Sequence, residues 1–154
     1  MDDLLAKALA SLPHGAEFRF IDRLVSLEPG VSGVGTYQLR GDEPFLKGHF
    51  PGRPLLPGVL LVEAGAQLAG IVAQCAPSIP PLTDLRLTAL RSVKILGSAE
   101  PGQVIQIEAR VTGRLGNLVQ AEAKVLLGSQ TIMQGALTLS GTLRVVQSTA
   151  AVNS

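Results

Sequence analysis

The chain has few of the residues with which proteins bind nucleic acids. Aromatic residues make up 3% of the sequence, tryptophan is absent, and charged residues account for only 16%, with a formal net charge of +1. Binding to nucleic acid needs a basic surface, and single strands are commonly held by stacking on aromatic rings. We therefore expect no nucleic-acid partner.

Cysteine and histidine are also scarce. The one cysteine, Cys75, excludes an intrachain disulfide, and within an apolar segment it is expected to fill the core. The two histidines, His14 and His49, stand at no recognised metal-ligand spacing with it. The sequence predicts no metal site and no cofactor.

No segment has the pattern of an export signal or a membrane span. The first ten residues carry acids where a signal peptide has its basic region, and they predict a short amphipathic helix before Pro13. The apolar run over residues 59–75 is marginal in length and contains Glu63 and two glutamines. We expect a cytoplasmic protein with no membrane association.

The 154 residues, 46% of them hydrophobic, suit a single domain spanning residues 1–154. The core is expected over about residues 10–143, with a frayed tail at 144–154. Alternating patterns separated by turn residues predict six strands and one long helix between the second and third strands. The predicted strands cover residues 18–27, 31–39, 85–95, 104–111, 118–127 and about 130–143. This order indicates an α+β fold with an antiparallel sheet around a central helix.

The most informative segment is the loop over residues 48–58, Gly-His-Phe-Pro-Gly-Arg-Pro-Leu-Leu-Pro-Gly. Its prolines restrict the backbone, and its glycines permit turns and the close approach of a ligand. The loop presents His49 and leads into the apolar helix that carries Glu63. A potential base and a potential acid thus lie close together in the sequence.

The polar side chains of that helix fall on one stripe. Gln67 and Gln74 follow Glu63 by four and eleven positions, so all three lie on one face, while the other faces are apolar. A carboxyl group in such surroundings either binds a proton more readily or finds a partner. Both residues also have a purely structural interpretation. His49 could serve just to hydrogen-bond within its loop, and Glu63 could form a structural ion pair with an arginine such as Arg91.

The motif over residues 42–67, Asp-Glu-Pro-Phe-Leu-Lys-Gly-His-Phe-Pro-Gly-Arg-Pro-Leu-Leu-Pro-Gly-Val-Leu-Leu-Val-Glu-Ala-Gly-Ala-Gln, strongly resembles the (3R)-hydroxyacyl-acyl-carrier-protein dehydratases of bacterial type II fatty acid synthesis, FabZ type. Leu12-Pro13-His14 and Phe20-Ile21-Asp22-Arg23 resemble that family's N-terminal signature. The resemblance implies a hot-dog fold and a homodimer with shared sites, commonly a trimer of dimers. It also implies that acyl carrier protein is the partner.

On this pattern His49 of one protomer and Glu63 of the other are the catalytic residues. His49 would take the C2 proton, Glu63 would protonate or orient the leaving hydroxyl, and the Gly58 N–H would hold the thioester carbonyl. Gln67, one turn after Glu63, is expected to fix its carboxyl group. The predicted substrate-binding residues are Phe50, Gly58, Val59 and Gln67.

The implied reaction converts the hydroxyacyl thioester to the trans-2-enoyl thioester, in fatty acid or related polyene and polyketide lipid biosynthesis. The acyl tunnel is expected to be almost wholly apolar beyond the site. Arg53, Arg91 and Lys94 are candidates for a basic rim that meets the acidic carrier protein, and ordinary solvated charges explain each of them equally well. His14 is expected to be a structural hydrogen-bonding residue beside the first strand.

Two other functions remain open. A hot-dog acyl thioesterase would share the fold and the acyl substrates, because one fold hosts several chemistries. A noncatalytic acyl-binding subunit is the other alternative, and the intact His49, Gly58 and Glu63 argue against it.

Overall fold

The computed structural model describes residues 2–46 and 52–143. Two α-helices, two short 3-10 helices and six strands follow one another along the chain. In order they are α1 (Asp2–Ala10), η1 (Ala16–Phe18), β1 (Arg23–Glu28), β2 (Ser32–Gln38), η2 (Pro44–Leu46), α2 (Gly58–Gln74), β3 (Thr83–Ile95), β4 (Val104–Leu115), β5 (Leu118–Leu127) and β6 (Gln130–Thr142).

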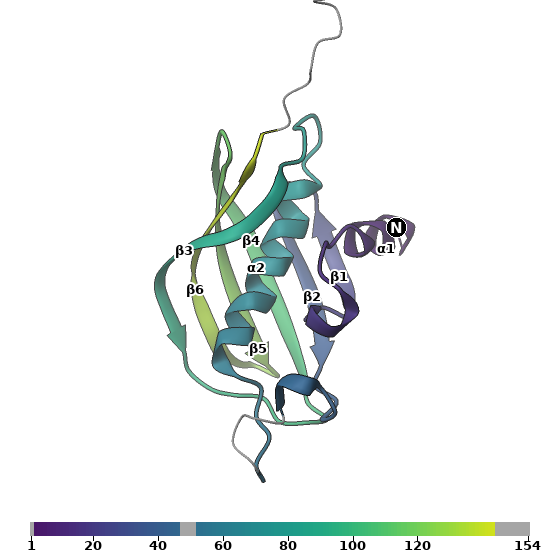
Figure 1. The fold of residues 1–154 in the computed structure, drawn as a ribbon, viewed down its shortest axis with the longest axis vertical. Coiled ribbons are helices and arrows are strands. Elements are labelled where there is room, and N and C mark those ends of the chain that lie inside the picture. The colour runs from purple at the N-terminus through teal and green to yellow at the C-terminus, as the bar shows by residue number, and fades with distance from the viewer. Residues whose placement is uncertain (1, 47–51, 144–154) are drawn as a thin grey trace, which may run out of the picture.

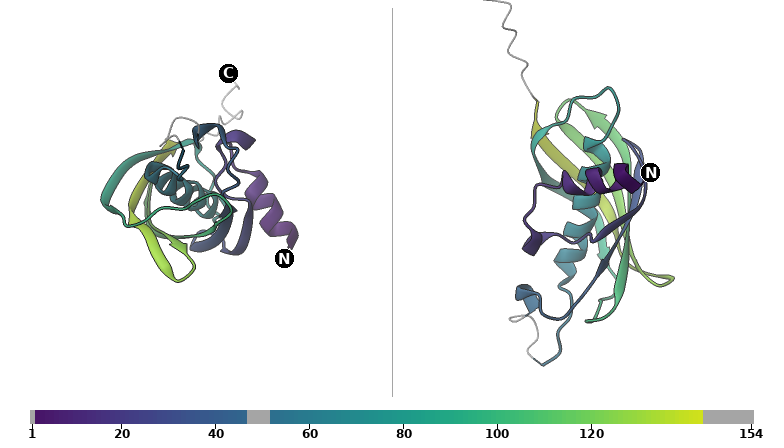
Figure 2. Two further views of the ribbon diagram at one scale, coloured as in Figure 1. Left: turned by 90° about the horizontal axis from the view of Figure 1, so that it is seen from below. Right: turned by 90° about the vertical axis from the view of Figure 1, so that its right-hand side faces the viewer.

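The six strands form one antiparallel sheet in the order β1-β2-β4-β5-β6-β3. The sheet curls around α2, which lies along its inner face (Figures 1 and 2). The predicted α+β architecture, with an antiparallel sheet around a long central helix, is confirmed.

Strict alternation of side chains separates the two faces of the sheet. Along β5, Val119, Ala121, Ala123 and Val125 are buried, while the residues between them are exposed. Successive side chains of a strand point to opposite faces, so the buried set faces α2. The core therefore lies between the sheet and this helix.

Small residues let α2 lie close to the sheet. A Cβ atom added to Gly65 would stand 2.8 Å from the Cβ of Ala123, and one added to Gly33 would stand 2.9 Å from Val72.

At the C-terminal end of α2, the Arg114 guanidinium donates to the Ala73 carbonyl at 3.0 Å. Cations suit the C-terminus of a helix, where carbonyl groups lack partners.

The predicted elements agree with the structure except near the start of the sheet. The first strand was expected to begin at Phe18, but Phe18 ends η1 and β1 begins at Arg23. The reason is a tertiary contact: the Gln67 side chain binds the backbone on both sides of residue 19, which replaces the pairing of a strand. The strand predicted over residues 104–111 is also longer than expected, because β4 continues to Leu115.

Within the described part of the chain, no helix is long and apolar enough to cross a membrane.

Candidate active site

The polar stripe of α2 faces a cavity of about 750 Å³. The cavity lies between α2, β3 and the segment that joins α1 to η1. Glu63, Gln67 and Gln74 all line it, as their common helix face predicts. Its other lining residues are Ser11, Leu12, Pro13, His14, Ala66, Gly70, Ile71, Leu82, Asp84, Leu85, Arg86, Leu87 and Leu139.

Within the described part of the chain, Glu63 has two partners, and both reach the same oxygen. The Gln67 Nε2 donates to Glu63 Oε1 at 3.2 Å, and the His14 Nε2 lies 3.3 Å from that oxygen. The Glu63 side chain is 22% exposed, so it lies at the cavity wall and still reaches solvent. The second partner is a histidine, and the alternative of a structural pair with Arg91 is not what the structure shows.

Gln67 is the buried centre of this group, with 3% of its surface exposed. Its Nε2 also donates to the Phe18 carbonyl at 2.8 Å, and its Oε1 accepts from the Phe20 N–H at 3.0 Å. The predicted contact between Gln67 and Glu63 is present. The same side chain fixes the backbone of residues 18–20 against α2.

His14 was expected to be structural, and its contact with Glu63 was missed. Its ring stacks on Phe18, with centroids 6.0 Å apart. The Arg19 guanidinium donates to the His14 carbonyl at 2.6 Å and to the Leu12 carbonyl at 3.0 Å, which holds the loop. Forty-nine positions separate His14 from Glu63, so spacing gave no signal, and only the likeness of residues 12–14 to a family signature pointed here.

Gly58 and Val59 occupy the N-terminal end of α2. Gly58 begins the helix, so its N–H belongs to the first-turn amides that have no acceptor within the helix. A Cβ at Gly58 would come within 3.0 Å of the Ile95 side chain, so the space beside this glycine is taken by Ile95 rather than left open. Val59 is 70% exposed.

His49 and Phe50 lie outside the described residues. Their predicted roles as base and substrate contact stay predictions.

The candidates for the basic rim are all exposed. Arg53 comes within 4.0 Å of the Glu100 carboxylate, at the edge of an ion-pair distance. Arg91 and Lys94 are exposed side chains of β3. The structure places charges there, and whether they meet a carrier protein stays a prediction.

The cavity is apolar along its middle and polar at both ends. Leucine, isoleucine and alanine side chains line the middle. At the end remote from Glu63, the Gln74 amide donates to the Leu82 carbonyl at 2.6 Å and accepts from the Leu82 N–H at 2.9 Å. Asp84 and Arg86 also line this cavity. The expectation of an almost wholly apolar acyl tunnel stays a prediction, and two charged side chains lie on the wall of this cavity.

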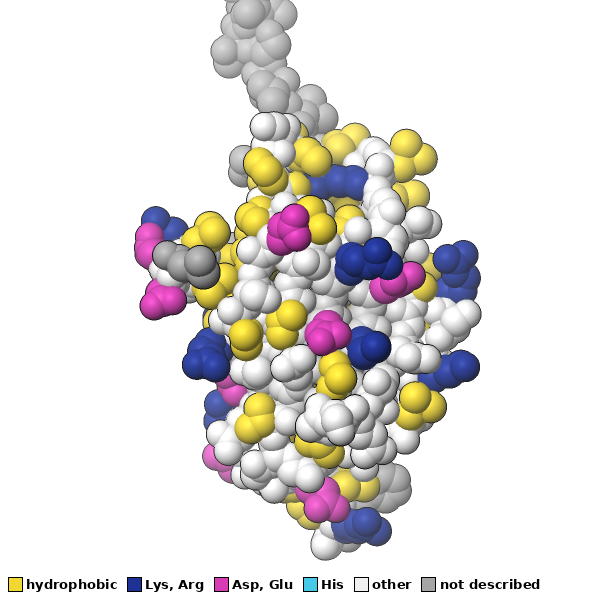
Figure 3. Space-filling view, turned by 180° about the vertical axis from the view of Figure 1, so that it is seen from behind, with side chains coloured by type: hydrophobic (Ala, Val, Ile, Leu, Met, Phe, Trp, Pro, Cys, Tyr) yellow, Lys and Arg dark blue, Asp and Glu magenta, His cyan; other side chains and the backbone are white. Residues whose placement is uncertain are grey.

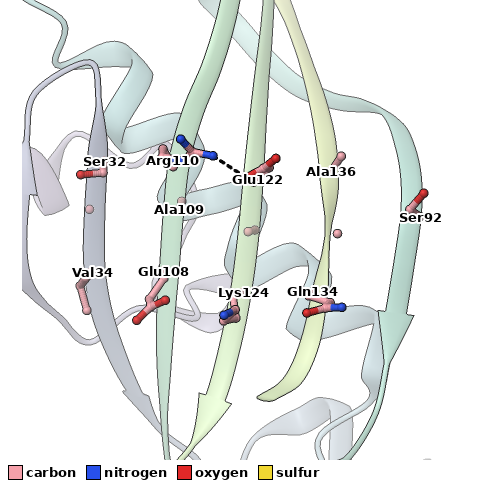
Figure 4. A pocket seen from close by; sticks show the side chains of 13 residues that line it. Ser32, Val34, Ser92, Glu108, Ala109, Arg110, Glu122, Lys124, Gln134 and Ala136 are labelled. Carbon is pink, nitrogen blue, oxygen red and sulfur yellow. Dashed lines mark hydrogen bonds and ion pairs between the residues drawn. The ribbon is translucent and has the colours of Figure 1, made fainter. Parts of the chain in front are cut away.

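A second hollow, of about 600 Å³, lies on the opposite face of the sheet (Figure 4). Among its charged side chains, Arg110 pairs with Glu122 across the strands at 2.8 Å. Seen from behind, this face carries scattered charges of both signs (Figure 3). The described residues that line this hollow include none of the predicted site residues.

No group of three or more potential metal ligands comes together within residues 2–46 and 52–143. Cys75 is half-buried, and burial raises the pKa of its thiol. A thiol with a raised pKa is a poor nucleophile at neutral pH, which agrees with a packing role.

Comparison with known proteins identifies the family. A family model described as the FabA-like domain matches residues 12–136. The 3-hydroxyacyl-[acyl-carrier-protein] dehydratase FabZ of Natranaerobius thermophilus is 39% identical over 132 residues, which cover 84% of this chain and 90% of that protein. The chain belongs to the FabZ-type dehydratase family. The FabZ of Geotalea uraniireducens is 42% identical over 98 residues, covering 63% of this chain and 68% of that protein.

Solved structures confirm the hot-dog fold of this FabZ-type chain. The dehydratase heterocomplex ApeI:P from Xenorhabdus doucetiae has a TM-score of 0.74 at 17% identity, covering 91% of this chain and 92% of the other. Zebra fish thioesterase superfamily member 2 has a TM-score of 0.64, also at 17% identity, covering 87% and 91%. At such low identity the likeness concerns the fold alone.

Proposed function

We propose that this protein removes water from (3R)-hydroxyacyl thioesters carried by acyl carrier protein and forms the trans-2-enoyl thioesters. Its membership of the FabZ-type family supports a dehydratase role in fatty acid biosynthesis. The observation that carries the chemical part of the proposal is the Glu63 carboxyl group, held by two side chains at the wall of a largely apolar cavity.

The reaction needs a base at C2, an acid at the hydroxyl group on C3, and donors for the charge that develops on the thioester oxygen. His49 takes the C2 proton, because a neutral imidazole is available near pH 7. Glu63 protonates or orients the departing hydroxyl group. The Gly58 N–H, at the positive end of α2, holds the thioester oxygen.

The cavity along α2 receives the acyl chain. It extends from Glu63 to Gln74, eleven residues of helix or about 16 Å at 1.5 Å per residue. An extended acyl chain advances about 1.25 Å per carbon, the projection of a carbon–carbon bond of about 1.5 Å. The hydrogen-bonded pair of Gln74 and Leu82 lies at the far end of this path, which has room for about 13 carbons beyond C3 and so suits acyl chains of up to about 16 carbons.

The site is completed by a second copy of the chain. In this arrangement His49 of one protomer faces Glu63 of the other, and dimers assemble further into a trimer of dimers. Arg53, Arg91 and Lys94 meet the acidic carrier protein, and a cytoplasmic location follows from that partnership. These statements rest on the resemblance described above, and the exposed positions of the three basic residues agree with them.

The deciding experiment is mass spectrometry of the purified protein incubated with 3-hydroxybutyryl- and 3-hydroxydecanoyl-carrier protein. We expect the loss of one water from the acyl group, with His49→Ala and Glu63→Gln each lowering turnover by about 100-fold or more, as for other general acids and bases. Release of free acid would instead identify a thioesterase, and no change in mass would point to a binding subunit or to a different substrate.

Glu122→Gln is the matched control for Glu63→Gln. Glu122 pairs with Arg110 on the face of the sheet away from the cavity, so its loss should leave turnover unchanged. A wild-type rate in Glu63→Gln or in His49→Ala would remove that residue from its assigned role.

A further inference from the structure

We propose that His14 is a positioning residue for the dehydration: with Gln67 it holds one oxygen of the Glu63 carboxyl group and leaves the other oxygen to exchange the proton with substrate. The inference rests on the proposed function of Glu63. It gives a role in the reaction to a residue that the sequence alone assigned to structure.

The two contacts converge on a single atom. His14 Nε2 lies 3.3 Å and Gln67 Nε2 lies 3.2 Å from Glu63 Oε1, and neither of these contacts involves Oε2. Two donors on Oε1 make that oxygen the poorer proton acceptor of the pair, because its lone pairs are already engaged. Oε2 is then the oxygen that faces the reacting hydroxyl group.

The surroundings of the ring decide which nitrogen donates. His14 Nδ1 is buried and has no hydrogen-bond partner within the described residues. A doubly protonated ring would bury an N–H group without an acceptor, which is costly. The arrangement therefore favours a neutral ring with its proton on Nε2, directed at Glu63.

The position of His14 is fixed independently of Glu63. Arg19 donates to the carbonyl groups of His14 and Leu12, and the ring stacks on Phe18. Gln67 in turn binds the Phe18 carbonyl, so one side chain anchors both the carboxyl group and the loop that carries His14. Groups held in this way keep a reacting atom within a narrow range of positions.

The kinetic test compares His14→Gln with His14→Met. The two replacements have similar length, but only glutamine keeps an N–H donor near the place of Nε2. We expect His14→Met to lower kcat about tenfold, the effect of losing one hydrogen bond to a charged group, with a change in KM below about threefold. We expect His14→Gln to stay within about threefold of the wild-type kcat. Thermal unfolding of both variants checks that they are equally folded.

A second measurement does not depend on turnover. In protein labelled with 15N-histidine, the chemical shifts of the two ring nitrogens report which one carries the proton. The chain has two histidines, so His49→Asn assigns the spectrum. We expect the Nε2–H form at His14 in the wild type and a loss of that preference in Glu63→Leu.

The outcomes separate this inference from the proposed function. A wild-type protein that leaves the hydroxyacyl substrates unchanged would refute the dehydratase. An active wild type in which His14→Met retains its kcat, or in which His14→Gln is as slow as His14→Met, would overturn the role of His14. A proton on Nδ1 in the wild type would overturn it as well.

Discussion

At the scale of single residues, Tyr37, which lies away from the site, shows how burial changes the pKa of a side chain. Its ring is 3% exposed, packs edge-on against Phe20 at 5.8 Å, and lies under the Arg40 guanidinium at 5.6 Å. Burial raises the pKa of Tyr37 to about 12, and the charge of Glu43 adds to the effect. The neighbouring Arg40 acts in the opposite direction and does not outweigh burial.

Tyr37 makes the stability of the protein depend on pH in the alkaline range. The tyrosine of the unfolded chain ionises near pH 10, below the folded pKa of about 12, so the contribution is fully present below pH 10 and is lost as pH rises towards 12. Because the chain has one tyrosine and no tryptophan, ultraviolet absorbance titrates Tyr37 alone. We expect a midpoint near 12 in native protein and near 10 in denaturant. Native and denatured midpoints that coincide would contradict the effect of burial.

The candidate site was predicted in part, and the part that was missed is tertiary. Glu63, Gln67 and Gln74 could be placed on one face from their spacing in a single helix. The partner of Glu63 could not, because His14 reaches it through a loop held by Arg19, a contact with no local sequence pattern. An arginine such as Arg91 was one alternative for the partner of Glu63, and the structure places His14 there instead.

At the scale of elements, two of the three glycines of α2, Gly65 and Gly70, have opposite surroundings. A Cβ at Gly65 would collide with Ala123, whereas a Cβ at Gly70 would meet Leu85 and Leu139 at 3.6 and 4.0 Å, ordinary contact distances. Gly70 also lines the cavity between Glu63 and Gln74. A side chain at position 70 would therefore fit the fold and reduce the space for substrate.

We predict that Gly70→Leu shortens the acyl chains that the enzyme accepts. Position 70 lies seven residues after Glu63, about 10 Å along the helix, which holds about eight carbons beyond C3, so chains longer than about eleven carbons should be excluded. The measurement is relative turnover of 3-hydroxybutyryl and 3-hydroxytetradecanoyl substrates, and the ratio should shift towards the shorter one. Gly70→Ala is the control, since it adds only a methyl group and should be as stable as the wild type or more so. An unchanged ratio in Gly70→Leu would place the acyl chain elsewhere.

The elements themselves were largely predictable, because each has a clear period. Helix α2 and strands β5 and β6 lie within one residue of their predicted bounds. The exception, the segment before β1, has an alternating sequence but is bound by the Gln67 side chain before it can pair as a strand. A pattern in the sequence indicates only the local preference of the backbone. Here the hydrogen bond between Phe20 and Gln67, which are 47 positions apart, overrides that preference.

At the scale of the whole molecule, the two edges of the sheet differ. Helix α1 packs beside β1 at one edge (Figure 1). At the other edge β3 pairs with β6 on one side only, and it exposes Leu90 and Ile95, which are 51% and 48% accessible. A long edge strand with exposed apolar side chains is a ready surface for pairing with another chain. We therefore predict that the proposed dimer forms along this edge.

We predict that Leu90→Lys converts the dimer to monomers, because two lysines would face each other across the two-fold axis. Leu115→Lys is the matched control: Leu115 is 80% exposed and ends β4, a strand that is not at an edge of the sheet. Light scattering after size-exclusion chromatography should show the lower mass for Leu90→Lys only. A dimer that survives in Leu90→Lys would mean that chains associate through another surface.

Mixing two inactive variants tests whether each active site takes residues from both chains of the dimer. If His49 and Glu63 act across the interface, a dimer of one His49→Ala chain and one Glu63→Gln chain contains one complete site and one site that lacks both groups. Coexpression of the two variants should therefore restore water loss from 3-hydroxyacyl substrates, whereas each variant alone stays inactive. If both groups belonged to the same chain, every site in the mixed dimer would lack one of them, and no activity would return. The result decides whether the unit of catalysis is the chain or the pair.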